Sequence, residues 1–340
     1  MHILITGAAG FIGSQLASTL LQQGHRVTGT DNINAYYARR LKYARLQNLG
    51  IDHAADIPIG GEAQGGGESL FRFVRLDLAD REGMARLFEQ GGFDVVVNLG
   101  GQAGVRYSIE NPFAYAEANL TGFLNVLEGC RRHPVRHLLY ASSSSVYGQA
   151  DHVPYREDDI TDSPVSLYAA TKKSDELMAY AYSKLYGIPA TGLRFFTVYG
   201  PWGRPDMAPF LFLRNILEGK PIRVFNHGEL SRDFTFIDDI VRGVTLLLPH
   251  PPASQVPHRV YNIGNSRPVA LMDFIHVIER VAGREAVMHF EGMQPGDVYC
   301  TFADTTRLHR DFGYTPQVGI EEGISRFYSW YKTYGHLIDE

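Results

Sequence analysis

The sequence predicts an α/β protein with a doubly wound parallel sheet and a smaller α/β lobe. Short apolar runs alternate with amphipathic stretches through the first half of the chain, which is the βαβ rhythm of a parallel sheet covered by helices. A glycine-rich turn joins the first apolar run to the first amphipathic stretch. After Gly200 the alternation weakens and prolines become frequent, which indicates a second lobe and a cleft between the two lobes.

The individual elements follow from the spacing of apolar residues. The apolar runs predict strands over residues 3–6, 26–30, 71–76, 95–99, 137–142 and 191–195. The amphipathic stretches predict helices over residues 11–23, 80–90, 112–132 and 166–186. Residues 56–69 are rich in glycine and polar side chains, so we expect a flexible surface insertion there.

Composition limits the class of partner and the compartment. The chain has 340 residues, of which 44% are hydrophobic, so it can bury a large core. A formal net charge of −5 argues against general affinity for nucleic acid and favours a small-molecule ligand. The two cysteines, Cys130 and Cys300, form neither a disulfide framework nor a metal-ligand spacing, so we expect free thiols and no metal site.

Targeting and membrane signals are not expected from the sequence pattern. The first residues enter a strand pattern directly and lack the charged and apolar regions of a signal peptide. The apolar runs are all interrupted well before the roughly 20 residues that a membrane-spanning helix needs. We therefore expect a cytoplasmic protein without a membrane partner.

The glycine-rich turn has the spacing of a dinucleotide-binding loop. Its glycines are spaced G-x-x-G-x-x-G between an apolar strand and a helix. In such a loop the first glycine permits the tight turn, the second lets the backbone approach a pyrophosphate, and the third packs the helix against the strand. The helix N-terminus then presents free N–H groups to the phosphates. The predicted cofactor contacts are Gly7, Gly10, Phe11, Ile12 and Gly13.

Acidic residues after the next strands indicate which dinucleotide binds. Asp31, followed by Asn32, closes the second strand at about the offset from the glycines where a carboxylate accepts hydrogen bonds from the adenosine ribose. This carboxylate would repel a 2′-phosphate, so the sequence favours NAD over NADP. Asp77, before Leu78, ends the third strand and is expected either to accept from the adenine amino group or to cap a helix.

A serine-rich strand end and a Tyr/Lys pair carry the predicted chemistry. Serines 142–145 end the strand over residues 137–142, and ligands of such sheets bind at the carboxyl ends of strands. The spacing of Tyr168 and Lys172 places a phenol and an ammonium on one helix face. A nearby ammonium and a positive nicotinamide favour the phenolate, which can take a proton from a substrate hydroxyl while hydride leaves the same carbon.

That pair alone is a weak signal. Tyrosine and lysine at this spacing also occur on many solvent-exposed helices. Its position downstream of the glycine loop and the serine-rich strand end favours the catalytic interpretation.

Several motifs together resemble the extended short-chain dehydrogenase/reductase superfamily, and within it the nucleotide-sugar 4-epimerases. They are the glycine loop, Asp31-Asn32, SSVYG at 144–148, Tyr168 with Lys172, RFFTVYGP at 194–201 and RDFTFIDD at 232–239. Three further motifs look like the UDP-glucuronate 4-epimerase branch: QAGVRYS at 102–108, GRPDMA at 203–208 and MQPGDV at 293–298. The resemblance covers nearly the whole chain.

The resemblance implies a fold, a cofactor and a reaction. It implies a Rossmann-type NAD-binding domain over residues 1–194 and a nucleotide-sugar-binding lobe over 195–340, with residues near 236–264 returning to the large domain. It implies a tightly held NAD that is regenerated in each turnover. Tyr168 would take the proton of the sugar C4 hydroxyl as hydride leaves C4, and after rotation of the 4-keto sugar the hydride would return to the opposite face. By analogy with this family, the resemblance further implies a homodimer that pairs through the helices over 112–132 and 166–186.

The resemblance also assigns contacts to the sugar nucleotide. Ser143 matches the serine or threonine that assists the tyrosine and would bind the C4 oxygen. The hydroxyls of Ser144, Ser145 and Thr197 suit the sugar carboxylate, because they donate hydrogen bonds without adding a positive charge. The positions matched for the UDP portion and its surroundings are Arg106, Arg204, Arg232, Gln294 and Asp297, where Gln294 replaces the arginine of epimerases that act on neutral sugars.

Three alternative functions remain open at this point. A UDP-glucuronate decarboxylase of the same superfamily would commonly carry an acidic residue where this chain has Ser145, and dehydratases carry an Asp-Glu pair where it has Ser144 and Ser145. A 4-epimerase of neutral UDP-hexoses is the second alternative. The third is an NAD-binding regulator without chemistry, against which the intact Ser143, Tyr168 and Lys172 argue.

Overall fold

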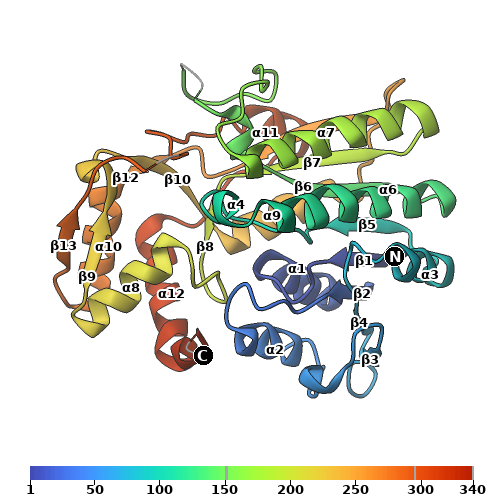
Figure 1. The fold of residues 1–340 in the computed structure, drawn as a ribbon, viewed down its shortest axis with the longest axis horizontal. Coiled ribbons are helices and arrows are strands. Elements are labelled where there is room, and N and C mark those ends of the chain that lie inside the picture. Colours follow the sequence, from blue (N-terminus) through green and yellow to red (C-terminus); the bar gives the residue numbers. More distant parts are fainter. Residues whose placement is uncertain (150–151, 295, 339–340) are drawn as a thin grey trace.

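The computed structural model describes residues 1–149, 152–294 and 296–338, and its central feature is one large sheet (Figure 1). All neighbouring strands of this sheet run parallel except the edge pair β3 and β4, which is antiparallel. In spatial order the strands are β11 (His258–Ile263), β7 (Ala190–Phe195), β6 (His137–Ser143), β5 (Val95–Asn98), β1 (His2–Thr6), β2 (Arg26–Asp31), β4 (Phe71–Arg75) and β3 (Glu62–Gln64).

Both faces of this sheet are buried, as its continuous apolar strands predict. Within β1, Ile3 and Ile5 belong to one hydrophobic core, whereas Leu4 belongs to the core on the opposite face. The same alternation occurs in β5, where Val96 faces away from its two valine neighbours. Side chains of a strand point alternately to its two faces, so a run without polar residues requires helices on both sides.

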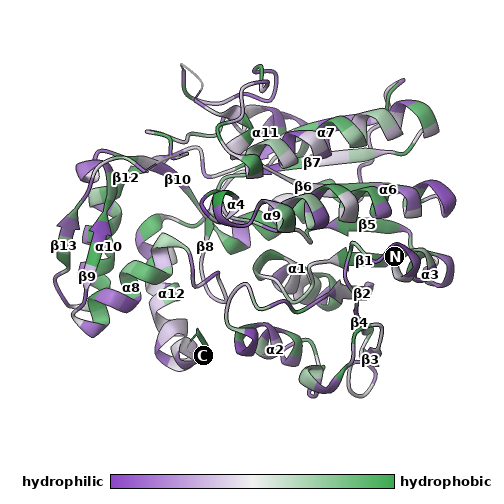
Figure 2. Ribbon diagram, viewed as in Figure 1, coloured by the Kyte–Doolittle hydropathy of each residue, from purple (hydrophilic) through white to green (hydrophobic). Residues whose placement is uncertain are grey.

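Helices supply that cover. The face of Ile3 and Ile5 is covered by α1 (Phe11–Gln22) and α9 (Ile237–Leu247), and the face of Leu4 by α3 (Arg81–Gly91), α6 (Gly122–Arg132) and α7 (Leu167–Tyr186). In Figure 2 the covering helices α6 and α7 carry both hydrophobic and hydrophilic segments, as expected of helices with one face on the sheet. Two shorter helices lie nearby, α2 (Arg39–Gln47) and α11 (Thr306–Phe312).

The second lobe combines small sheets with three helices and lies beside the large sheet (Figure 1). Its three-stranded sheet has the order β12 (Pro268–Ala270), β10 (Ser231–Phe236) and β8 (Thr197–Tyr199). Its two-stranded sheet pairs β13 (Val287–Phe290) with β9 (Pro221–Val224). The helices are α8 (Ala208–Glu218), α10 (Leu271–Ala282) and α12 (Ile320–Tyr334), and α10 packs on both others. The chain returns from this lobe to the large sheet through α9 and β11.

The predicted strands agree with the observed ones to within about a residue at each end, but two expectations about other segments are wrong and one helix was missed. The insertion expected over 56–69 is not irregular throughout, because residues 62–64 form β3 and pair with β4. The helix expected over 112–132 is divided into α5 (Pro112–Tyr115), a π-helical segment η2 (Ala116–Thr121) and α6. Helix α2 is absent from the predicted elements.

The strand order places the site. From β1 the chain runs outward through β2 and β4 and then returns to the other side of β1 through β5, β6 and β7. The crossovers therefore diverge between β1 and β5, and ligands of doubly wound sheets bind at the carboxyl ends of the strands at such a switch point. Among the described residues, no helix is both long enough and apolar enough to span a membrane.

Candidate active site

A cavity of about 510 Å³ opens at the carboxyl ends of the strands, between the large sheet and the second lobe. This volume lies within the range of small-molecule sites. Of the residues predicted for the site, those that line the cavity are Gly7, Gly10, Phe11, Ile12, Gly13, Asp31, Asn32, Asp77, Leu78, Ser143, Ser144, Ser145, Tyr168, Lys172, Thr197, Arg204, Arg232 and Asp297.

The three glycines of the loop lie where the backbone is packed too tightly for a side chain. Gly7 has a φ of +69°, and a Cβ atom there would lie 2.8 Å from the backbone nitrogen of Gly100. A Cβ atom at Gly13 would lie 2.2 Å from the carbonyl oxygen of Gly7. Gly10 is the N-cap of α1, so the first N–H groups of that helix point to the cavity side of the loop. The loop thus forms an open cradle of backbone donors that suits a pyrophosphate.

The carboxylates at the ends of β2 and β4 are held by backbone and side-chain donors. Asp31 accepts from the backbone nitrogen of Ile33 at 2.8 Å and from that of Ala9 at 3.2 Å. Asn32 donates to one oxygen of Asp77 at 2.8 Å, and the other oxygen of Asp77 accepts from the nitrogen of Ala79. Asp77 therefore organises the turn after β4 while it also lines the cavity.

Two basic residues of this region were missed by the sequence analysis. Lys42 lines the cavity and donates to the carbonyl and side-chain oxygens of Asn34. Arg45 lies behind the cavity and is 1% exposed. Both residues come from α2, whose polar composition gave no sign that its basic side chains are buried.

Arg45 joins the two halves of the site. Its guanidinium donates to the carbonyl oxygen of Ala9 in the glycine loop at 3.0 Å. It also donates to the carbonyl oxygens of Trp202 at 2.6 Å and Gly203 at 3.0 Å. The loop expected to hold the cofactor is therefore tied to the segment that precedes Arg204, which is expected to hold the substrate.

The Tyr/Lys pair lies in the first turns of α7, whose N-cap Ser166 accepts from the nitrogen of Ala169. The ammonium of Lys172 donates to the carbonyl oxygen of Ala141 at 3.0 Å and to Asp175 at 3.1 Å. Burial is the largest single influence and disfavours the charged ammonium, but the charge and hydrogen bond of Asp175 together with the charge of Tyr168 outweigh it and leave the pKa of Lys172 raised. Lys172 is therefore a buried cation beside Tyr168 at neutral pH.

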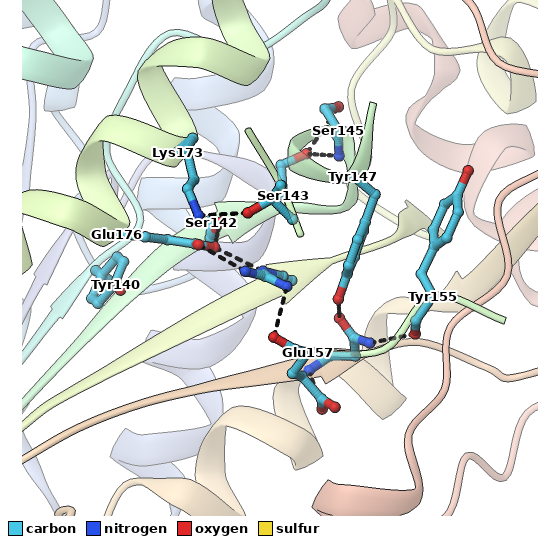
Figure 3. Close-up of polar contacts among 12 residues, drawn as sticks. Tyr140, Ser142, Ser143, Ser145, Tyr147, Tyr155, Glu157, Lys173 and Glu176 are labelled. Carbon is cyan, nitrogen blue, oxygen red and sulfur yellow. Dashed lines mark hydrogen bonds and ion pairs between the residues drawn. The ribbon is translucent and has the colours of Figure 1, made fainter. Parts of the chain in front are cut away.

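The hydroxyls at the serine-rich end of β6 point in two directions, one toward Glu176 and the other toward the turn at Ser145 (Figure 3). Ser143 accepts from the backbone nitrogen of Ser145 and donates to its hydroxyl, each at 3.1 Å, so the two serines form a tight turn at the cavity. Ser142 instead donates to the buried carboxylate of Glu176 at 2.6 Å. The hydroxyls available to a ligand are therefore those after Ser142.

A buried ion pair supports this turn from below. Glu176 accepts two hydrogen bonds from Arg194, each at 2.8 Å, and both side chains are at most 5% exposed. The guanidinium of Arg194 also lies over the ring of Tyr147, whose hydroxyl donates to Asn262 at 2.6 Å. Strands β6, β7 and β11 are thus linked beneath the serine turn (Figure 3).

The π-helical segment brings a further polar residue to the pair. Asn119 is 1% exposed and exchanges hydrogen bonds with the backbone of Gln102 at 2.8 and 3.0 Å. It also donates to the hydroxyl of Thr171 at 2.9 Å, next to Lys172. Single π-helical turns frequently mark functional sites, but their i→i+5 hydrogen bonding leaves no pattern that the sequence analysis could have used.

The residues expected to bind UDP are only partly brought together. Arg204 pairs with Asp206 and donates to the hydroxyl of Tyr36 at 3.3 Å. Arg106 and Gln294 lie outside the set of described residues that line the cavity. Arg106 is instead paired with Asp297 at 3.2 Å, and Gln294 accepts from the backbone nitrogen of Asp297 at 3.2 Å. Pro295, within the predicted motif over 293–298, lies outside the described residues.

Comparison with known proteins settles the family. The model of the NAD dependent epimerase/dehydratase family matches residues 3–264. The chain belongs to this family. The family member described here is 44% identical over 346 residues to a probable UDP-glucuronate 4-epimerase of Rhizobium meliloti, with 97% of each chain covered. It is 42% identical over 348 residues to UDP-glucuronate 4-epimerase 1 of Arabidopsis thaliana, with 98% of this chain and 77% of the relative covered.

A solved structure is similar over the whole of this family member. It is the UDP-glucuronic acid 4-epimerase of Bacillus cereus in complex with UDP-glucuronic acid and NAD. The TM-score is 0.87 at 33% sequence identity, and 98% of this chain and 99% of that chain are covered. The Rossmann-type fold predicted from the sequence is thereby confirmed.

Proposed function

We propose that this protein interconverts UDP-glucuronate and UDP-galacturonate by transient oxidation at C4, with a tightly bound NAD. The observation that carries this proposal is the meeting of the glycine loop, the Tyr168/Lys172 pair and the Ser143–Ser145 turn in one cavity. UDP-glucuronate 4-epimerases among the relatives, and a similar structure that holds UDP-glucuronic acid and NAD, support the choice of substrate and cofactor.

The residues present fit a bound NAD. The glycine loop leaves no room for a Cβ atom at Gly7 or Gly13 and leaves the N-terminus of α1 free for phosphates. Asp31 supplies the carboxylate expected for the adenosine ribose. When bound, NAD supplies the acceptor and later the donor of the C4 hydride. We assign the cofactor to residues 1–194 and the sugar nucleotide mainly to 195–340, with 236–264 returning to the large domain.

Proton transfer at C4 is the task of three residues in this proposal. Tyr168 takes the proton of the C4 hydroxyl and returns it after the sugar has turned. Lys172 favours the phenolate form of Tyr168 by its charge. Ser143, fixed by the nitrogen of Ser145, binds the C4 oxygen and orients it toward Tyr168.

The sugar carboxylate defines the substrate class. Ser144, Ser145 and Thr197 line the cavity and offer hydroxyl donors to an anionic group. The 4-keto sugar would lose carbon dioxide easily, so an epimerase has to bind the carboxylate firmly. Serines at 144 and 145 stand where the decarboxylases and dehydratases carry acidic residues, which favours epimerisation over both lyase reactions.

For the nucleotide we assign three of the predicted residues as direct contacts. Arg204 and Arg232 line the cavity and can meet diphosphate oxygens through their planar forks, while Asp297 can accept from ribose hydroxyls. Arg106 is assigned the role of holding Asp297, to which it is paired. Gln294 is assigned to the rim of this subsite, since its backbone carbonyl accepts from the nitrogen of Asp297 and so fixes the turn before that residue.

Purified protein incubated with UDP-glucuronate, without added NAD, tests the proposal. We expect NMR to reveal UDP-galacturonate, with no net NADH and no carbon dioxide. Accumulation of a pentose nucleotide would instead identify a decarboxylase. Epimerisation of UDP-glucose without epimerisation of UDP-glucuronate would identify an enzyme of neutral sugars, and absence of turnover with either sugar would favour a non-catalytic regulator.

We further propose that the protein works as a homodimer in the cytoplasm. Helices α6 and α7 expose large apolar side chains, which are Leu124, Leu177, Tyr180 and Leu185. Such a patch on paired helices favours association with a second copy. A Leu177→Arg, Leu185→Arg variant should then be monomeric by light scattering, whereas a parent that is itself monomeric would refute the dimer. The free thiols of Cys130 and Cys300 support a reducing compartment.

A further inference from the structure

Lys172 has a buried anionic neighbour on its own helix. Asp175 lies one turn further along α7, its side chain is 2% exposed, and its Oδ2 atom is 3.1 Å from the ammonium nitrogen of Lys172. The carbonyl oxygen of Ala141 accepts a second proton of the same ammonium at 3.0 Å. An ammonium has three donors, so one remains for the cavity that Lys172 lines.

The environment of Asp175 is unusual for a purely structural carboxylate. Its second oxygen, Oδ1, is buried and has no hydrogen-bond partner among the described residues. Leaving one oxygen of a buried carboxylate unpaired costs free energy, and a neutral side chain of the same shape would fill the space at a lower cost. What Asp175 supplies and a neutral residue could not is a negative charge beside Lys172.

The other charged and titratable groups around Asp175 do not replace this pairing. On the same helix lie Tyr168 and Glu176, and Glu176 is already compensated by Arg194 from β7. From β6 the phenol of Tyr140 is near enough for the charge of Asp175 to act on it, but its hydroxyl is hydrogen-bonded to His258. The π-helical segment contributes the neutral amide of Asn119 near Lys172. Lys172 is therefore the cation that balances Asp175 in the described part of the chain.

We propose that Asp175 is a positioning residue that sets how strongly Lys172 promotes the phenolate of Tyr168. It fixes the ammonium between α7 and β6, and its negative charge cancels part of the positive field that Tyr168 would otherwise experience. This inference rests on the proposed function in one respect, namely that Tyr168 acts as the base.

The sign of the effect follows from the charges. With Asp175 ionised, the Lys172/Asp175 pair is nearly neutral, so the phenolate gains less from Lys172 than it would from a lone ammonium. Replacing Asp175 by asparagine removes the opposing charge, while the carbonyl of Ala141 and the phenolate of Tyr168 itself still favour the ammonium. The acidic limb of the rate profile should then move to lower pH, by roughly half to one pH unit. Burial raises the pKa of the Asp175 carboxyl to about 6 despite Lys172, so the two proteins should differ most above that pH.

The experiment compares Asp175→Asn with a matched control, Asp162→Asn. Asp162 pairs with Lys173, the next lysine of the same helix, at 4.0 Å, but its side chain is 78% exposed. Both changes remove one carboxylate next to a lysine, and only one of these lysines faces the cavity. The kcat/KM for UDP-glucuronate is measured against pH for the parent and both variants, after thermal melts have established that each is folded.

A second measurement needs no sugar nucleotide and therefore separates this inference from the proposed function. Tyrosinate absorbance of the protein with its bound cofactor is titrated against pH, and the contribution of Tyr168 is isolated by subtracting a Tyr168→Phe partner of each variant. We expect the Tyr168 signal to arise at lower pH in Asp175→Asn and to stay unchanged in Asp162→Asn. An unchanged or upward shift in Asp175→Asn, or an equal shift in the control, would overturn the proposal. If the parent is inactive on UDP-glucuronate but Asp175→Asn still shifts the Tyr168 titration, the proposed function is refuted and the role of Asp175 is not.

Discussion

At the scale of single residues, the site is built from side chains whose positions are fixed before a ligand arrives. Ser143 is held by the backbone of Ser145, and Lys172 is held by the carbonyl of Ala141 and by Asp175. Preformed hydrogen bonds of this kind reduce the reorganisation required in the transition state. The proton chemistry is then concentrated on Tyr168, which makes that residue the most direct target for mutation.

Tyr168→Phe removes the phenolic oxygen and keeps the ring. Because positioned proton transfer contributes about 10²–10⁴-fold to a rate, we expect kcat to fall by that factor while bound NAD and the melting temperature stay near those of the parent. Steady-state kinetics and cofactor absorbance check this result. Tyr186→Phe, at an exposed position at the end of the same helix, is the matched control and should be fully active.

Ser145 tests how the sugar carboxylate is bound. Ser145→Asp places a negative charge against the substrate, whereas Ser145→Asn has the same shape without the charge. Since like charges brought together cost several kcal/mol, we expect the aspartate variant to raise KM for UDP-glucuronate at least about tenfold over the asparagine variant. Equal KM values for the two variants would mean that the carboxylate lies elsewhere.

At the scale of elements, α2 links the two binding segments through Arg45. Arg45→Met would leave the carbonyls of Ala9, Trp202 and Gly203 without their donor in a buried place. We expect a loss of about 2–4 kcal/mol in unfolding free energy and easier release of NAD on gel filtration. Arg40→Met, an exposed position of the same helix, should change neither quantity. If a folded Arg45→Met protein retains NAD as firmly as the parent, Arg45 does not hold the cofactor loop in place.

The elements also reveal what the sequence could predict. Strands of the large sheet were predictable because burial on both faces demands continuous apolar runs, such as Ile3, Leu4 and Ile5 in β1. The Tyr168/Lys172 pair and the serine turn were predictable because their positions in the chain follow the sheet topology. Strand β3 was missed because its neighbours are rich in glycine, and the π-helical segment was missed because its apolar spacing resembles that of an α-helix.

Buried contacts between distant segments were beyond sequence reasoning. Arg45 and Asn119 are polar residues on helices, which are usually exposed, and only the fold reveals the carbonyls they meet. The same holds for Arg106 and Gln294, whose motifs drew attention to them but which lie outside the cavity lining. A motif indicates the region in which a residue lies, but where its side chain points depends on how the two lobes pack.

At the scale of the whole molecule, two histidines, of which one is buried and the other half-buried, link stability to pH. His137 is fully buried between the carbonyl of Leu248 and the hydroxyl of Thr191, and His258 is bonded to Tyr140. Burial lowers the pKa of both His137 and His258 to about 4. Both are neutral in the folded and unfolded chain above about pH 6.5, but below that pH the unfolded chain takes up protons that the folded chain refuses.

Stability should therefore fall as the pH drops from about 6.5 toward 4, with a loss of about 2 kcal/mol for each histidine at pH 5. Urea unfolding at a series of pH values measures this loss. His258→Gln should reduce the slope of unfolding free energy against pH between about pH 6.5 and pH 5. His289→Gln, a change at an exposed position, should leave this slope unchanged. A slope that is the same in all three proteins would mean that other groups determine the acid sensitivity.

The cavity between the lobes unites these scales, because the cofactor loop, the proton-transfer residues and the hydroxyls for the sugar all face it. The central claim is that hydride leaves C4 and returns to the same carbon without exchange. UDP-glucuronate deuterated at C4 tests it directly when the product is analysed by NMR and mass spectrometry. We predict UDP-galacturonate that retains the deuterium at C4. Loss of deuterium to solvent, or its recovery at another carbon, would contradict the account.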